Sequence, residues 1–203
     1  MKIKPILFST PMVNAILKGR KTQTRRIIKS RHESGLFRIG QTKEGFITEI
    51  TSLDWDERPK NDCCNDIKPI ANIGDILWVR ETWRWSDDLE DFCYKANSVK
   101  PDLSKWKPSI FMPKEAARIF LKVTNVRVER LHDISIEDIC REGLSSNLRE
   151  HDACCDLRDK WESLWCKING ANSWESNPWV WVYEFEKVER PANFLGVSEV
   201  VNE

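Results

Sequence analysis

Residues 6–26 read ILFSTPMVNAILKGRKTQTRR, a stretch that predicts the end of a strand, a short helix, a sharp turn and a second strand. Ser9 or Thr10 is a typical helix cap, and Pro11 follows in the first turn, where its missing N–H does no harm. Gly19 ends the helix, because glycine reaches the left-handed conformation without a clash of a β-carbon. The apolar run before the helix, KPILFS, is typical of a short buried strand.

The predicted strand after the turn is KTQTRRII, residues 21–28. Side chains alternate along a strand, so successive residues belong to opposite faces. The two predicted sets are Thr22, Thr24 and Arg26 on one face, and Gln23, Arg25 and Ile27 on the other. One face therefore carries two hydroxyls and a guanidinium in a row.

The charge of the chain is unevenly distributed. The first 32 residues contain nine basic side chains and no acidic one, and seven of the nine lie in LKGRKTQTRRIIKSR. Because the whole chain has 32 residues of each sign, the remainder carries a net charge of minus nine. Positive charge concentrated at a sharp turn suits an anionic ligand, such as RNA or a nucleotide. The neutral total favours a small ligand or a short single strand over a long duplex.

Cysteine and apolar content indicate the compartment and exclude some classes of site. Seven Cys is an odd number, and MKIKPILFSTP has too short an apolar stretch for a signal peptide, so we expect a cytoplasmic protein with reduced thiols. No run approaches the length of a membrane span. The adjacent pairs Cys63–Cys64 and Cys154–Cys155 are poorly suited to tetrahedral zinc. We expect neither a metal nor another cofactor.

The rest of the chain alternates strands and helices without a repeated βαβ unit, which predicts an α+β domain around a small, partly closed barrel. We expect one domain over residues 1–190, with an insertion at about 30–72 and a tail at 191–203. The insertion is expected to hold a hairpin around Gly40 to Gly45. The other predicted elements are a strand after Gly74, a loop-rich stretch over 83–113, and strands over 118–130 with a bulge or turn at Asn125. A helix from Ser135 to Glu142 that stops at Gly143, a helix over 151–168 and a strand over 179–188 are predicted to follow.

Several segments together resemble the ASCH family, whose members are similar to PUA-like RNA-binding barrels. The family motif G-x-K-x-x-x-x-R is matched by Gly19, Lys21 and Arg26. The segments IGDILWVRETW, KPSIFMPKEAARIFLKVTNVRVERLHDISIEDICREGL and NPWVWVYEFEKV look like the longer ASCH proteins of bacteriophages and prophages. The resemblance covers residues 3–188 and implies a small mixed β-barrel flanked by helices, with loop-rich insertions.

The resemblance also implies candidate activities. Small ASCH proteins remove the acetyl group from N4-acetylcytidine with a Lys, a Thr three residues later and a Glu on a later helix. Lys21 and Thr24 match the first two, and Glu142 is the best match for the third. Other members of the family bind RNA, and some cleave it. This chain is about twice as long as the small amidohydrolases, so the resemblance implies a shared fold more strongly than a shared reaction.

Independently of the resemblance, the side chains of Lys21, Thr24 and Glu142 determine whether amide hydrolysis is chemically possible. Thr24 supplies a hydroxyl, and Lys21 acts as a base only if its pKa is well below the usual value. The flanking cations Arg20, Arg25 and Arg26 lower that pKa, and Arg26 suits an oxyanion or a phosphate. An ionised Glu142 beside Lys21 would raise the pKa and oppose base action, which leaves the role of Glu142 open.

Three hypotheses follow from these patterns. The first is a hydrolase acting on an acylated base, with Lys21, Thr24 and Glu142 catalytic. The second is a module that binds RNA, a nucleotide or a modified nucleoside without chemistry. Arg80 and Glu81, at the end of the strand ILWVRE, are further candidates for binding, although a surface ion pair explains them equally well. The third is an assembly protein that uses its ten Trp, some of which otherwise pack the core or stack on bases.

Overall fold

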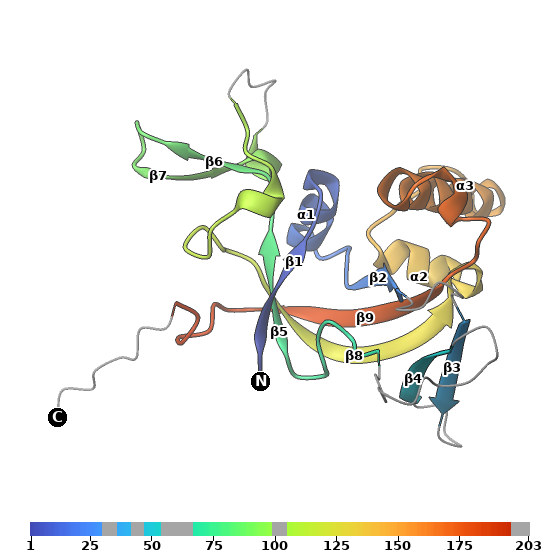
Figure 1. Ribbon diagram of the computed structural model, residues 1–203. Coiled ribbons are helices and arrows are strands. Elements are labelled where there is room, and N and C mark those ends of the chain that lie inside the picture. Colours follow the sequence, from blue (N-terminus) through green and yellow to red (C-terminus); the bar gives the residue numbers. More distant parts are fainter. Residues whose placement is uncertain (30–35, 42–46, 54–66, 99–104, 196–203) are drawn as a thin grey trace.

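The computed structural model of the chain describes residues 1–29, 36–41, 47–53, 67–98 and 105–195. Its centre is a five-stranded mixed sheet with the order β1-β5-β8-β9-β2. The strands are β1 Ile3–Leu7, β2 Gln23–Ile27, β5 Ile76–Arg80, β8 Phe120–Arg130 and β9 Trp179–Val188. Figure 1 shows the long, curved β8 and β9 running together beneath the helices. The predicted α+β class is confirmed, and the four strand regions predicted to pair do lie in one sheet.

The pairing within this sheet explains its shape. β1 pairs with β5 in parallel, and every other neighbour in the order is antiparallel. The register of β8 against β9 shifts between Val123 and Asn125, which confirms the predicted bulge, although β8 continues through it as one strand. Among the described residues the ladder leaves β1 and β2 as the two edges. An Arg26 side chain bridges these edges by donating to the Leu7 carbonyl at 3.0 Å.

Three helices cover one side of the sheet in Figure 1: α1 Thr10–Leu17, α2 Ile136–Arg141 and α3 Glu150–Asn169. Ser9 is the cap residue of α1 as predicted, but its hydroxyl makes no capping hydrogen bond. Gly19 follows α1 with φ +70°, the left-handed conformation expected there. Ser135 caps α2 by accepting a hydrogen bond from the Asp138 N–H at 3.1 Å.

Most Trp side chains pack the interior. Trp161 and Trp165 of α3 lie in an apolar cluster with sheet residues such as Val180 and Val182. Trp78 lies in another cluster, which also contains Phe194. Phe194 falls in the predicted tail, yet it is buried at 4% exposure and meets Trp78 edge-on at a centroid distance of 5.7 Å. The apolar core therefore includes Phe194, a residue of the predicted tail 191–203.

Two hairpins stand outside the main sheet. β3 Leu36–Gln41 pairs with β4 Ile47–Leu53, which confirms a hairpin in the 30–72 excursion, with its tip outside the described residues. β6 Trp83–Ser86 pairs with β7 Asp91–Tyr94 and projects from the body in Figure 1. The stretch 83–113 was predicted to be loop-rich, so β6 and β7 are a correction.

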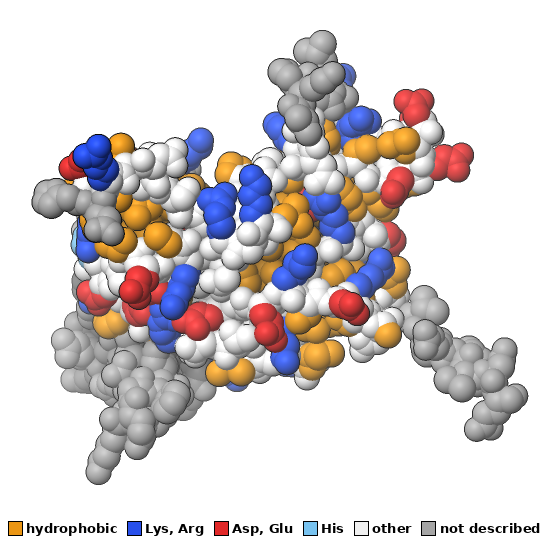
Figure 2. Space-filling model, turned by 180° about the vertical axis from the view of Figure 1, so that it is seen from behind, with side chains coloured by type: hydrophobic (Ala, Val, Ile, Leu, Met, Phe, Trp, Pro, Cys, Tyr) orange, Lys and Arg blue, Asp and Glu red, His pale blue; other side chains and the backbone are white. Residues whose placement is uncertain are grey.

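Four single-turn helices complete the described elements, and they are η1 Lys95–Asn97, η2 Ser109–Phe111, η3 Leu131–Asp133 and η4 Ala171–Ser173. None of the described helices combines the length and the apolar composition needed to cross a bilayer. On the face that Figure 2 shows, Lys and Arg side chains are scattered among hydrophobic and acidic ones and form no continuous basic band.

Candidate functional site

Lys21 and Glu142 form a buried ion pair beneath the sharp turn. Their exposed fractions are 2% and 3%, and Lys21 Nζ lies 2.6 Å from Glu142 Oε2. The same ammonium donates to the Glu142 carbonyl at 3.0 Å and to the Gln23 carbonyl at 2.8 Å. Each of its three protons thus has an acceptor. The predicted proximity of these two side chains is present.

The local backbone brings the pair together. Residues 21 and 142 form an isolated antiparallel bridge, and the Thr22 N–H donates to the Arg141 carbonyl at 2.8 Å. Gly143 follows with φ +99°, and a β-carbon there would lie only 2.7 Å from the Ala15 β-carbon. The glycine therefore lets the end of α2 approach α1 and the turn closely.

The surroundings of Lys21 decide what it can do. Burial lowers the pKa of Lys21, Glu142 opposes that effect, and the charges of Arg26 and Arg25 add to the lowering. A general base needs a free lone pair, however, and the three acceptors around Nζ match a charged ammonium. In this arrangement Lys21 is a hydrogen-bond donor, and base action requires one of the three bonds to be released.

Arg25 is held by three carboxylates. Its guanidinium lies 2.9 Å from both Glu129 and Asp138 and 3.2 Å from Glu142. Arg127 contacts Glu129 and Asp138 as well, so the carboxylates are shared between two guanidinium groups. Burial alone would raise the pKa of Asp138, but hydrogen bonding and these cations lower it. The Asp138 N–H donates to the Ser135 hydroxyl at the start of α2, while the Asp138 carboxylate lies in this network.

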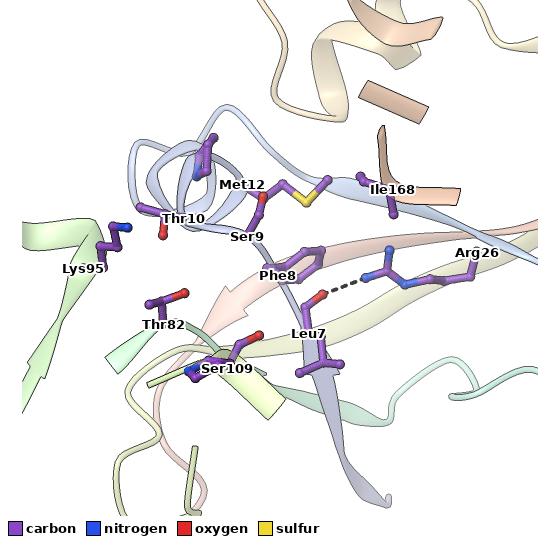
Figure 3. Close-up of a pocket in the computed structure, with 12 residues that line it drawn as sticks. Leu7, Phe8, Ser9, Thr10, Met12, Arg26, Thr82, Lys95, Ser109 and Ile168 are labelled. Carbon is purple, nitrogen blue, oxygen red and sulfur yellow. Dashed lines mark hydrogen bonds between the residues drawn. The ribbon is translucent and has the colours of Figure 1, made fainter. Parts of the chain in front are cut away.

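An open cleft of about 550 Å³ lies beside the network, between the start of α1 and the segment that follows β5. Figure 3 shows Arg26 on one side of it and Lys95 on the other, with Ser9, Thr10, Thr82 and Ser109 around it. We call this space the outer cleft. None of the described residues that line it is acidic.

The start of α1 adds donors to the outer cleft. The first N–H groups of a helix have no partner within it, and they carry a partial positive charge. Thr10, Pro11 and Met12 all line the cleft, so this helix end borders it. Arg26 is fixed on the other side by its bond to Leu7 and by its position over the Phe8 ring, 5.3 Å from the centroid.

A smaller space of about 30 Å³ lies deeper, between β2 and α3. We call it the inner cavity. Thr24, Arg25 and Glu142 line it from one side, and Trp161 and other α3 side chains line it from the other. Lys21 lines neither this cavity nor the outer cleft, whereas the hydrolase hypothesis requires Lys21 and Thr24 to share one site. Thr24 and Arg26 do share the inner cavity.

The inner cavity and the outer cleft are neighbours. Met12, Arg26 and Ile168 line both, so these three side chains form part of the boundary between the two spaces. Ile168 is 51% exposed, because it lies in the last turn of α3 at the rim of the cleft.

The remaining predicted residues do not line the outer cleft. Arg20 is exposed and donates to the Gly143 carbonyl at 3.2 Å, where it supports the turn. Glu81 is 1% exposed and forms a two-bond pair with Arg118, at 2.8 and 2.9 Å, so the suggested Arg80–Glu81 surface pair is wrong. Arg80 donates to the Ile110 carbonyl instead. Among the described residues, no group of three or more His, Cys, Asp or Glu has the arrangement of a metal site.

Lys95 is the functional candidate that sequence reasoning missed. It follows β7, and the Lys95 N–H donates to the Thr82 carbonyl at 3.0 Å, which brings it back to the cleft. Its position depends on the β6–β7 hairpin, which was not predicted. The segments WRWS and DFCY form the two strands of that hairpin, and predicting their pairing would have placed Lys95.

A comparison with solved structures finds the ASCH domain from Lactobacillus crispatus JV V101, determined at high resolution by crystallography. The sequence identity is 9%, the TM-score is 0.41, and the match covers 93% of this chain and 81% of that one. No family model matches the chain, and no curated protein does.

Proposed function

We propose that this protein binds a nucleotide or a short single-stranded RNA segment in the outer cleft. The observation that carries the proposal is the composition of the cleft, which has two cations, four hydroxyl side chains and a helix start, and no acidic side chain among its described lining residues. Such a set of groups attracts a phosphate and offers it hydrogen bonds. Lys95 and the first turn of α1 are the proposed phosphate contacts.

The size and charge of the molecule support a small ligand. A volume of about 550 Å³ is in the usual range for small-molecule sites. The chain has 32 basic and 32 acidic residues, whereas long duplexes are bound along broad basic surfaces. We therefore propose a mononucleotide or a few linked nucleotides.

The sequence resemblance supports the same ligand class. Gly19, Lys21 and Arg26 match the ASCH motif, and ASCH proteins include RNA-binding members. On this basis we propose an ASCH protein of the phage and prophage type with a PUA-like fold, acting within the cytoplasm on host RNA or nucleotides.

The affinity for a phosphate-bearing ligand tests the proposal. Wild-type protein is expected to bind uridine 5′-monophosphate, and Lys95→Gln to bind it about tenfold more weakly, because one charged phosphate contact is lost. The salt dependence of binding should also be shallower in Lys95→Gln. Titration calorimetry at several salt concentrations measures both effects.

Lys122→Gln is the matched control for this measurement. Lys122 is an exposed lysine on β8 whose Nζ lies 3.9 Å from Glu186, and it does not line the cleft. Its affinity and salt slope should equal those of the wild type. Equal weakening in the two variants, or no binding by the wild-type protein, would contradict the proposal.

A second candidate function is hydrolysis of an acylated base, because Thr24 and Glu142 line the same inner cavity. The Thr24 hydroxyl would attack the acyl carbon, the amine would leave with a proton, and water would then release the acid from the threonine ester. In this scheme Lys21 must release one hydrogen bond to serve as a base. Release of acetate from N4-acetylcytidine tests it.

A further inference from the structure

Two residues that line the inner cavity, Arg25 and Trp161, each carry a buried N–H group without a hydrogen-bond partner among the described residues. Arg25 and Trp161 are each 3% exposed, and nothing among the described residues accepts a hydrogen bond from Arg25 Nε or Trp161 Nε1. Both side chains line the inner cavity. Buried donors are normally satisfied, by protein groups or by water. Two unsatisfied donors beside one space indicate a place for an acceptor.

The size of the cavity limits what can enter. A space of about 30 Å³ holds roughly two water molecules, or one small substituent, and cannot hold a base ring. Because Met12, Arg26 and Ile168 border both spaces, a ring in the outer cleft lies one side chain away from the cavity. A ligand would therefore insert a single group while its ring stays outside.

The charges around the cavity favour a neutral acceptor. Three carboxylates already surround the Arg25 guanidinium, and one of them, Glu142, lines the cavity itself. A second anion beside Glu142 would be buried against a like charge, which is unfavourable. A carbonyl oxygen accepts hydrogen bonds from both donors without adding a charge.

We infer that the inner cavity selects bases that carry a ring carbonyl, whose oxygen accepts hydrogen bonds from Arg25 Nε and Trp161 Nε1. The inference rests on the proposed function, because the base must first lie in the outer cleft. Uracil, cytosine, guanine and hypoxanthine have such an oxygen, whereas adenine has none. The protein thus discriminates against adenine.

Inosine 5′-monophosphate and adenosine 5′-monophosphate provide a matched pair of probes, because their purines differ at the carbonyl position. Calorimetry with the full chain is expected to give an affinity for the inosine nucleotide about tenfold higher. Ribose 5-phosphate, which has no base, is the reference for the phosphate contacts. Trp161→Phe removes one donor and should reduce the preference for inosine, while the affinity for ribose 5-phosphate stays unchanged.

Trp174→Phe is the control for the loss of an indole. Trp174 packs against the same apolar cluster as Trp161, but it does not line the inner cavity. This variant should keep the wild-type preference. A preference reduced equally in both variants, or retained in Trp161→Phe, would overturn the inference.

A measurement on the wild-type protein makes the test independent of the variants. The indole N–H resonance of Trp161 should shift when inosine 5′-monophosphate is added and stay in place with adenosine 5′-monophosphate. A shift with both nucleotides, or with neither, would overturn the carbonyl contact. If ribose 5-phosphate and both nucleotides bind equally, this inference alone fails; if none of the three binds, the proposed function fails as well.

Discussion

At the scale of single residues, the environment of Lys21 separates the two candidate functions. Its ammonium donates to three acceptors within 3.0 Å, an arrangement that stabilises the charged form although burial lowers the pKa. No hydrogen bond joins Lys21 to Thr24 among the described residues. The Lys21–Glu142 ion pair therefore has a structural role in this arrangement. Catalysis by Lys21 as a base requires one of its three hydrogen bonds to break.

Single-residue variants test this difference through acetate release from N4-acetylcytidine. If the hydrolase is active, Thr24→Ala and Lys21→Ala should each lower kcat/KM by at least ~100-fold, because a nucleophile and its base act as a unit. The double variant should lose little more than either single variant. A wild-type protein that binds the nucleoside without releasing acetate would exclude the hydrolase and leave the binding function.

At the scale of elements, the site depends on the close packing of α1, the turn and the end of α2. Gly143 permits this packing, because a β-carbon there would lie 2.7 Å from the Ala15 β-carbon and 3.0 Å from the Lys21 β-carbon. Gly170, after α3, has nearly the same φ, +98°, with nothing within 4 Å of the corresponding position. The two glycines therefore share a positive φ and differ in crowding.

Alanine substitutions at these two glycines should have unequal effects on stability. Gly170→Ala carries only the cost of the backbone conformation at φ +98° and ψ 154°, about 1–3 kcal/mol. Gly143→Ala adds a steric clash in a packed contact and should cost about 1–3 kcal/mol more. Urea unfolding of the two variants measures the difference. Equal free energies of unfolding would mean that the contact between α1 and α2 is looser than described.

How far the sequence predicts this arrangement depends on the range of the interactions. Gly19, the Ser135 cap and the bulge near Asn125 were predicted correctly, since each depends on neighbouring residues. The β6–β7 hairpin was missed, and Lys95 with it, because both depend on pairing between separate segments. The partners of Arg25 lie 104 to 117 residues away in sequence, so alternation along β2 alone gave no indication of them.

At the scale of the whole molecule, three of the nine basic residues in the first 32 positions lie in two different environments. Lys21 and Arg25 are buried and neutralised by carboxylates from β8, α2 and the residue after α2, which explains part of the acidic excess elsewhere in the chain. Arg26 borders the outer cleft, where it is joined by Lys95 from a distant segment. The anionic ligand suggested by the sequence is therefore expected at the cleft between these two cations.

The position of a bound nucleotide tests this central claim most directly. A crystal structure of the protein with uridine 5′-monophosphate is expected to show the phosphate within hydrogen-bonding distance of Lys95 and the first turn of α1, with the ring of the base near Met12 and Arg26. A nucleotide bound at another surface, with the outer cleft empty, would contradict the account.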